Sequence, residues 1–555
     1  MSRGRRRRTA TGRKGRSGAG GQGRPAPAHA RHAGVRRWVV LVVLCVTLLV
    51  ISLDATILNV AIPTVARSLP ATSSQLQWIV DAYSVVFAGL LLVLGSTGDR
   101  LGRKKVFMAG LGVFAAGSAA AAFSGSPGHL MAARAVMGAG AAGIMPSTLS
   151  ILSNVFTEES ERANAIGIWS ASTGVGVAAG PIVGGWLLAH YWWGSVFLVN
   201  VPIAAIGIVA ASLLVPDSRN LGADRPDPAG AGLSTVGLAV LLWGIIEAPG
   251  RSWSSPVIVA ALAGGVGLLA CFVAWERHCD HPMLRVAFFR SRRFSAAIGA
   301  MALVLFGLLG AFFLETQWLQ FNLGYSPLQT GFRVAPIALV VLVAAPGSSV
   351  LARLAGTKPV VFAGMASIAA GLFLLSRTTV AGGYTDALPA YLAIGLGTGL
   401  ALAPSIESVL GSLPPAEAGV GSATSDTALQ LGGAVGVAVL GTALNARYGT
   451  KMAAFLAGVP LPEGVRHTVL GSVGGALAVA SRAGGAAGGR LAAVARQSFV
   501  SGMDLGLLLG AAVVATAAVV VLVVLPNRAP GGTTPRRAAR RLPGGRERHG
   551  RRVPG

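Results

Sequence analysis

The sequence predicts an all-α integral membrane protein. Fourteen transmembrane helices are expected to form two pseudo-repeated halves of six helices, with two further helices inserted between them. Composition is the first reason. Of the 555 residues, 53% are hydrophobic and 12% are charged, whereas soluble proteins carry about 25% charged residues. With a mean hydropathy of +0.65, this chain cannot be a set of soluble domains.

The second reason is a recurrence of apolar runs of about 20 residues, the length that crosses a bilayer. We expect fourteen membrane-spanning helices, at residues 38–60, 79–97, 106–124, 130–153, 163–189, 195–215, 231–248, 256–275, 294–316, 328–352, 359–377, 388–411, 420–445 and 501–525. No small-residue cleavage site ends the first run, and thirteen runs follow it. It is therefore expected to be a helix rather than a cleaved signal peptide.

The third reason is a weak internal repeat. The connection GDRLGRKKVF, after the second span, resembles LARLAGTKPVV at 351–361, after the tenth. Parallel repeats of this type build transporters with a substrate site between the halves. The predicted organisation is a basic tail (1–37), a six-helix half (38–215), a linker with two extra helices (216–293), a second six-helix half (294–525) that includes a long outer loop (446–500), and a basic tail (526–555).

Most of the net charge of +26 lies in the two tails. Residues 1–37 carry twelve Lys or Arg and no acid, and residues 527–555 carry nine Arg and one Glu. Both tails lack hydrophobic periodicity, so we expect them to be disordered and to contact anionic lipid headgroups. A nucleic-acid partner is not expected, because no stacking aromatic residues are interleaved with the arginines.

The orientation follows from the short connections, since cytoplasmic loops are enriched in Lys and Arg. With residue 1 inside, the even-numbered connections are cytoplasmic, and both termini are expected on the cytoplasmic side of the cell membrane. The basic residues of these connections include Arg100, Arg103, Lys104, Lys105, Arg162, Arg219, Arg225, Arg277, Arg285, Arg290, Arg292 and Arg293.

No metal, cofactor or enzymatic centre is expected. The three cysteines are scattered, and the HCDH stretch at 278–281 is interpreted as a cytoplasmic loop because no second ligand cluster accompanies it. No Gly-x-x-x-x-Gly-Lys-Ser/Thr nucleotide loop is present. The histidines lie outside the predicted span cores, apart from His190 at a boundary.

The stretch GSTGDRLGRKK resembles the signature loop of the major facilitator superfamily. Glycines there permit a tight turn and close helix approach, and the Asp99 carboxylate can pair with Arg103 as a charge latch between two arrangements of the halves. A merely positive cytoplasmic loop would explain the Lys and Arg, but neither the aspartate nor the glycine spacing. The candidate gating residues are Gly95, Gly98, Asp99, Arg100, Gly102, Arg103 and Lys104.

Two further stretches resemble the fourteen-span drug:proton antiporter branch of that superfamily, which includes exporters of quaternary ammonium compounds and other drugs. In LDATILNVAIP, Asp54 lies about 24 Å from the inner end of its span at 1.5 Å per residue, and acids at such depth are functional candidates. In LQWIVDAYSVVFAG, Asp81 is accompanied by Trp78 and Tyr83, whose rings could bind a cationic substrate. The alternatives are an interfacial acid for Asp54 and a helix cap for Asp81.

The fourth span, RAVMGAGAAG, carries Arg134, which should hold a nearby carboxylate ionised; snorkelling is the alternative. Met137 stands where the family usually has Gln. The thirteenth span, GSATSDTALQLGG, carries Asp426 where some relatives have more acids. The acids Glu247, Glu315, Glu407 and Asp504 are expected at solvated span ends.

The fifth span contains GVGVAAGPIVGG, which resembles the antiporter motif. Glycines every four residues form one bare stripe that admits another helix backbone, and the proline bends the helix there. Generic small-residue packing is the alternative interpretation. The candidate residues are Gly176, Gly180, Pro181, Gly184 and Gly185.

The resemblance implies a proton-coupled antiporter that exports lipophilic compounds, cationic ones being favoured, with Asp54, Asp81, Arg134 and Asp426 coupling substrate to protons. The alternative is a dedicated exporter of an endogenous metabolite such as an antibiotic. A monomer without cofactor is expected.

Overall fold

The computed structural model describes residues 28–219, 226–414 and 418–527. This part of the chain contains helices and no β-strand, and fourteen of its helices are long and apolar enough to cross a membrane. The predicted fold class is therefore confirmed. Residues 1–27 and 528–555 of the tails, predicted to be disordered, lie outside the described residues. Residues 28–37 were also predicted to be disordered, but they form the first part of a helix that continues into the first span.

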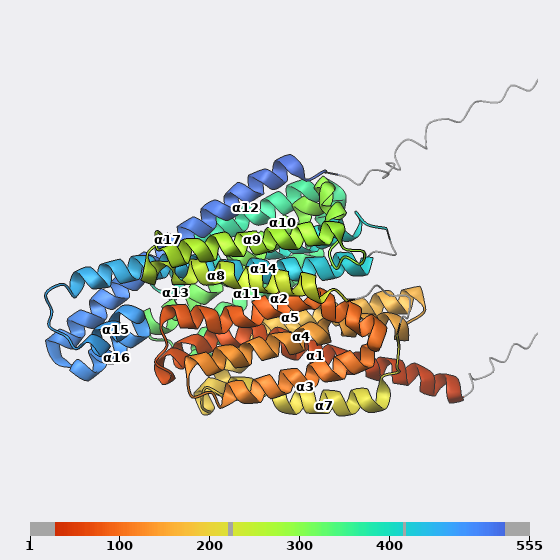
Figure 1. Ribbon diagram of the computed structural model, residues 1–555, viewed down its shortest axis with the longest axis horizontal. Helices are drawn as coiled ribbons and strands as arrows, with labels where there is room; N and C mark the ends of the chain where they lie inside the picture. Colours follow the sequence, from red (N-terminus) through yellow and green to blue (C-terminus); the bar gives the residue numbers. More distant parts are fainter. Residues whose placement is uncertain (1–27, 220–225, 415–417, 528–555) are drawn as a thin grey trace, which may run out of the picture.

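The N-terminal half packs around α1, α2 and α4. In Figure 1 it forms the red-to-yellow part of the bundle. The helix α1 packs against α5, and α4 packs against both α2 and α3. The elements are α1 (Ala28–Ser68), α2 (Ser73–Leu101), α3 (Arg103–Ala122), α4 (Pro127–Val155), α5 (Glu159–His190), α6 (Ser195–Leu198) and α7 (Asn200–Leu214).

The C-terminal half repeats this arrangement. The helix α10 packs against α14, and α13 packs against α11 and α12. The last turn of α10 widens into the π-helical η2. The elements are α10 (Arg292–Gln317), η2 (Trp318–Asn322), α11 (Pro327–Ala355), α12 (Thr357–Leu375), α13 (Tyr384–Leu410), α14 (Ala418–Phe455) and α17 (Gly485–Val524).

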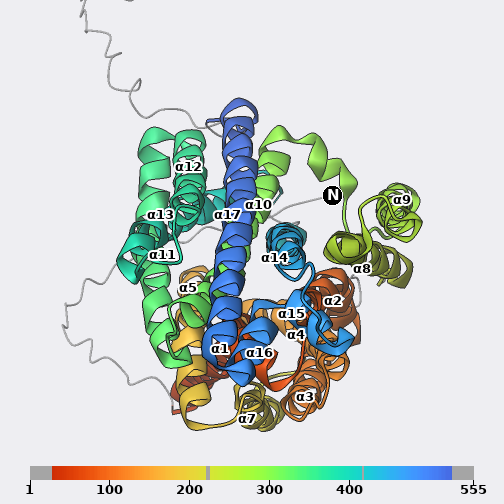
Figure 2. The ribbon, with the colours of Figure 1, turned by 90° about the vertical axis from the view of Figure 1, so that its left-hand side faces the viewer.

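Two helices lie outside the halves, as the sequence suggests. The helices α8 (Pro228–Arg251) and α9 (Pro256–His278) form a pair, and the short η1 (Val286–Arg290) follows them. The pair stands at the side of the bundle in Figure 2. Of the two, α8 makes the contacts with α2 and α14, so it covers the seam between the halves.

The two ends of the bundle differ. The helix α1 begins and α17 ends at one end, which we call the tail end, on the right in Figure 1. The opposite end, the loop end, carries α15 (Glu463–Gly471) and α16 (Val473–Ala483).

The segment 446–500 is largely helical, although a long loop was expected. The helix α14 continues to Phe455, and α17 already begins at Gly485. Between them α16 buries Val473, Ala476 and Ala480, one face of a helix. The helices α15 and α16 have 9 and 11 residues, too few to cross a membrane, so hydropathy alone does not reveal them.

The halves meet closely toward the loop end. A Cβ atom on Gly185 of α5 would lie 2.6 Å from the Pro327 carbonyl of α11. At a separate contact between the halves, the Gln77 side chain of α2 donates to the carbonyl oxygens of Val437 (3.1 Å) and Ala438 (3.2 Å) on α14.

At the tail end, polar contacts join helices of the same half. The Arg37 guanidinium on α1 pairs with Glu161 on α5 at 2.7 Å, and Arg293 on α10 donates to Ser408 on α13 at 3.0 Å. The described bundle is thus held together across the halves mainly near its loop end.

Candidate transport site

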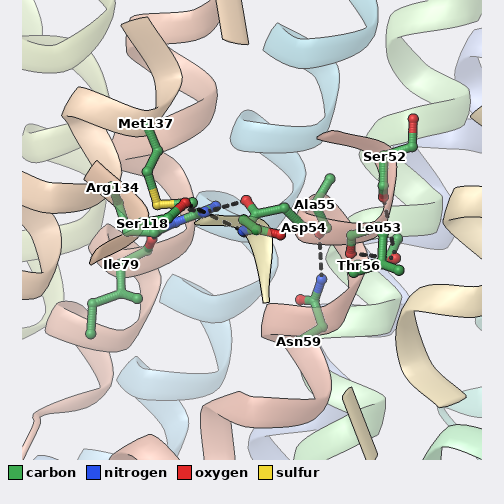
Figure 3. A network of polar contacts seen from close by, with 11 residues as sticks. Ser52, Leu53, Asp54, Ala55, Thr56, Asn59, Ile79, Ser118, Arg134 and Met137 are labelled. Atoms are coloured by element: carbon green, nitrogen blue, oxygen red, sulfur yellow. Dashed lines mark hydrogen bonds and ion pairs between the residues drawn. The ribbon is translucent and has the colours of Figure 1, made fainter. Parts of the chain in front are cut away.

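A buried ion pair joins two helices of the N-terminal half. Asp54 on α1 is 0% exposed and Arg134 on α4 is 1% exposed. Their Oδ2 and Nη1 atoms lie 2.6 Å apart, and the two side chains point toward each other in Figure 3. The sequence singled out both residues, and the structure brings them together.

Neutral polar groups form hydrogen bonds with both members of this ion pair. The Asn200 amide donates to the other Asp54 oxygen at 3.0 Å and reaches Ser118 Oγ at 3.4 Å. The Arg134 Nε donates to the Ile79 carbonyl at 3.2 Å. Such bonds offset part of the cost of burying two charges. Sequence reasoning missed Asn200, whose signal is a lone amide inside an apolar run.

The ring of Tyr83 lies against the same cation. The Arg134 guanidinium carbon is 4.3 Å from the centre of that ring, and Tyr83 is 2% exposed. The aromatic face expected to receive a substrate cation is thus occupied by an internal one. Met137, which stands where the family usually has Gln, places its sulfur 3.9 Å from Arg134 Nη1.

Asp81 lies apart from this pair, on the face of α2 that meets the other half. It is one helical turn from both Gln77, which bonds α14, and Val85, which packs among residues of α8 and α14. Asp81 is 0% exposed, and neither carboxyl oxygen has a hydrogen-bond partner among the described residues. Trp78 packs beside the same apolar cluster, half-buried. A buried, unpartnered carboxyl group between the halves is costly and is a candidate ligand for a cation or a proton.

Asp426 is not brought to the Asp54 pair. It is half-buried near the start of α14, toward the tail end. Gln430, one turn further along, is also half-buried. The structure therefore separates Asp426 from the other candidate acids.

Glu315 corrects one expectation. It is 1% exposed rather than solvated, and its Oε1 accepts a hydrogen bond from Tyr391 on α13. The physical reason is that α10 does not end at residue 316 but continues through η2 to Asn322, so Glu315 lies inside the helical segment.

The other acids expected at span ends differ in exposure. Glu407 is exposed and accepts from Ser349 at 2.6 Å. Glu247 lies 3.8 Å from Arg251. Asp504 is half-buried, and its Oδ1 has no partner among the described residues.

The loop between α2 and α3 forms the turn that its glycines suggest. Gly102 alone separates the helices, with φ = 121°, which only glycine adopts readily. The Arg103 Nε donates to Asp99 at 2.7 Å, and its Nη1 reaches the Ser150 carbonyl of α4 at 3.2 Å. Lys104 donates to the Ser212 carbonyl of α7 at 2.8 Å. These bonds all stay within the N-terminal half.

The rest of this loop region packs on α4. A Cβ atom on Gly95 would lie 3.4 Å from Pro146, and one on Gly98 would lie 3.4 Å from Ser147. Arg100 is half-buried.

The glycine stripe of α5 packs directly on α1. A Cβ atom on Gly176 would lie 2.6 Å from the Leu49 carbonyl, and one on Gly180 or Gly184 would overlap the Thr56 or Ile57 side chain. The stripe therefore permits backbone approach along one face, as predicted.

Pro181 contributes a specific bond to this contact. Proline has no N–H, so the carbonyl four residues earlier, at Val177, loses its helical partner. The Thr56 hydroxyl of α1 donates to that carbonyl at 3.3 Å. On the other side of α5, a Cβ atom on Gly331 of α11 would overlap the Pro181 carbonyl. The motif thus joins α1 to the second half.

Comparison with known proteins agrees with this architecture. The chain matches the model of the Major Facilitator Superfamily over residues 44–437. It is 37% identical to the multidrug efflux pump LfrA of Mycolicibacterium smegmatis over 86% of this chain and 94% of that protein. It is 32% identical to the tetracenomycin C resistance and export protein of Streptomyces glaucescens over 88% of this chain and 91% of that protein.

A solved structure shares the fold. The crystal structure of a bacterial homologue of the human lysosomal transporter Spinster, inward-facing and unoccupied, aligns with a TM-score of 0.62 at 16% identity. It covers 88% of this chain and 98% of its own. The chain belongs to the Major Facilitator Superfamily and is a multi-pass membrane transporter rather than an enzyme, which confirms the family predicted from its motifs.

The ion pair predicts strongly non-additive stability. Asp54→Asn or Arg134→Gln alone should destabilise the protein by about 3–5 kcal/mol, because each leaves one buried charge without its partner. The double variant should lose less than the sum of the single losses. Unfolding of detergent-purified protein measures this, and additive losses would show that the pair is not coupled.

The glycine stripe predicts a position-specific steric effect. Gly180→Leu should cost about 1–3 kcal/mol because its side chain would be forced into α1. Gly174→Leu, on the same helix, is the matched control, since nothing lies within 4 Å of a Cβ atom there. Thermal unfolding of both variants tests this; equal shifts would mean that helix propensity, rather than contact with α1, sets the loss.

Proposed function

We propose that this protein is a proton-coupled antiporter that exports lipophilic compounds, with cationic compounds favoured. The observation that carries the proposal is the set of acids buried in the bundle: Asp54 paired with Arg134, and Asp81 unpartnered between the halves. Intramembrane acids of this kind mark ion and proton pathways. The names of the relatives, a multidrug efflux pump and an antibiotic resistance and export protein, support export as the direction.

We place the tail end in the cytoplasm and the protein in the cell membrane. Supporting this, α1 begins and α17 ends at the same end of the bundle, and the connections there hold most of the short-loop Lys and Arg. In this proposal the protein acts as a monomer whose basic residues contact anionic headgroups.

The proposed cycle starts from a carrier closed toward the outside. The loop-end contacts between the halves support this assignment, since the loop end would face out. A lipophilic cation enters from the tail end and is neutralised by Asp81. Opening outward would break the contacts of Gln77 with α14 and of α5 with α11. In this proposal the Asp99–Arg103 pair, whose bonds stay within the N-terminal half, biases this step from the inner side.

Protons would reset the carrier through Asp54. A proton taken up by this carboxylate removes the negative partner of Arg134, leaving a buried cation without compensation. That cost favours the alternative arrangement of the halves, in which the proton can be released inside. Coupling then follows because substrate and proton each bias the same equilibrium.

A second candidate is export of one endogenous metabolite, such as an antibiotic, with drug resistance as a side effect. The relative named for tetracenomycin C export favours it. Growth inhibition across a panel of compounds separates the candidates, since a dedicated exporter would protect against one chemical class.

Purified protein in liposomes tests proton coupling. An imposed pH gradient, acidic on the side of the loop end, should drive dye accumulation, and an uncoupler should abolish it. Dye export that persists after the gradient has collapsed would rule out proton coupling.

The position of Asp81 predicts charge-selective loss. Asp81→Asn should reduce transport of divalent cations more than transport of neutral compounds, because only the former need a negative charge between the halves. Initial rates for both classes in the same liposomes provide the measurement. Equal losses for the two classes would count against a charge role.

A further inference from the structure

The C-terminal half contains its own buried carboxyl group. Glu315 on α10 and Tyr391 on α13 are 1% and 0% exposed, and the Tyr391 hydroxyl donates to Glu315 Oε1. The second oxygen, Oε2, has no hydrogen-bond partner among the described residues. A buried carboxyl group with one hydrogen-bonded oxygen and one oxygen without a partner is costly to hold as an anion.

The position of this pair mirrors that of Asp54 and Arg134. The helices α10 and α13 are the first and fourth of their half, as α1 and α4 are of theirs. Arg134 lies eight residues beyond Ser126, the N-cap of α4, and Tyr391 lies eight residues beyond Gly383, the N-cap of α13. The two halves therefore place the partner of a buried acid at the same distance from the N-cap of their fourth helix, with tyrosine replacing arginine in the second half.

That replacement removes the compensating charge. No described cation lies within ion-pair distance of Glu315. Two candidate cations bond elsewhere: Arg134 pairs with Asp54 on α1, and Arg496 on α17 donates to the Phe321 carbonyl. The surrounding helices carry further titratable groups: Tyr384, Asp386 and Glu407 on α13, Asp426, Arg447, Tyr448 and Lys451 on α14, Arg490 and Asp504 on α17, Lys358 at the tail-end start of α12, Arg67 on α1, and Arg292 and Arg293 at the start of α10.

Glu315 is also connected to the contact between the halves. It lies one turn before η2, and π-helical turns often occur at functional sites. Gln320 of η2 donates to the Val60 carbonyl of α1 at 2.9 Å, and the Arg67 guanidinium of α1 lies 5.5 Å from the Phe321 ring centre. A change of charge at Glu315 would therefore occur beside a segment that holds α1.

We infer that Glu315 is a second proton-binding site of the transporter, in addition to Asp54, and that Tyr391 is its positioning residue. The inference rests on the proposed antiport and deepens it. In the arrangement described here Glu315 holds its proton, because no cation offsets a negative charge. This proton is taken up while the carrier is open outward. When substrate and water enter from the tail end and reach Oε2, the carboxyl group releases the proton inside, so each cycle carries one proton more inward than the Asp54 pair alone would carry.

Infrared difference spectra of the protein in lipid nanodiscs, recorded between acidic and alkaline pH, detect the proton without any substrate. The C=O bands of protonated buried carboxylic acids in the wild type should include one component that is lost in Glu315→Gln and persists in Glu315→Asp, while the contribution of Asp81 stays in all three proteins. Tyr391→Phe should keep the band but shift its titration, since the hydrogen bond is lost. Glu407→Gln is the matched control, because that acid is exposed at the end of α13, and it should leave the band unchanged.

Counting protons per tetraphenylphosphonium ion in liposomes gives the second readout. Glu315→Gln should lower the ratio by one proton, whereas Glu407→Gln should not. An unchanged band and ratio in Glu315→Gln overturn the inference, while loss of coupling in Asp54→Asn would still support the antiport. Wild-type protein that moves the cation with no proton would instead refute the proposed function.

Discussion

The structure depends on a charge pair held where water is excluded. Asp54 and Arg134 join α1 to α4 at 2.6 Å, and each alone would be a buried charge costing several kcal/mol. Dipoles from Asn200 and the Ile79 carbonyl, and the ring of Tyr83, offset part of that cost. Such a site is stable while both charges are present and unstable once a proton neutralises one. This property makes a structural contact usable as an energy-coupling device.

Close backbone packing transmits that local change to the halves. The glycine stripe of α5 allows α1 to approach closely. The Thr56 hydroxyl donates to the Val177 carbonyl, which has no helical donor because residue 181 is proline. The same part of α5 meets α11 of the other half. A shift of α1 therefore cannot occur without a response at the interface between halves, since packed helices rearrange between discrete states rather than deform gradually. A second contact between the halves, that of Gln77 with α14, lies one helical turn from Asp81.

Much of this was predictable, and the exceptions have physical causes. Apolar runs reveal spans because lipid forces every backbone group into helices, and the four-residue spacing of Asp99 and Arg103 suffices to predict their pair. The prediction that Glu315 lies at a solvated span end was wrong. Hydropathy places a helix end where polar residues begin, whereas α10 continues through η2. The contact of Tyr83 with the Arg134 guanidinium depends on where α2 meets α4. The formation of the helices α15 and α16 depends on the packing of α15 against α16 and of α16 against α17. None of these can be derived from periodicity within one segment.

The account stands on the claim that protonation of Asp54 shifts the arrangement of the halves. Spin labels at Gly125→Cys and Ala381→Cys, in exposed loop-end turns of the two halves, report that arrangement once the native cysteines are replaced by serine. Pulsed dipolar distances in lipid should show two populations whose ratio changes between acidic and alkaline pH, and Asp54→Asn should fix the ratio. A distance distribution that ignores pH in the wild type, or that responds equally in Asp54→Asn, would contradict the claim.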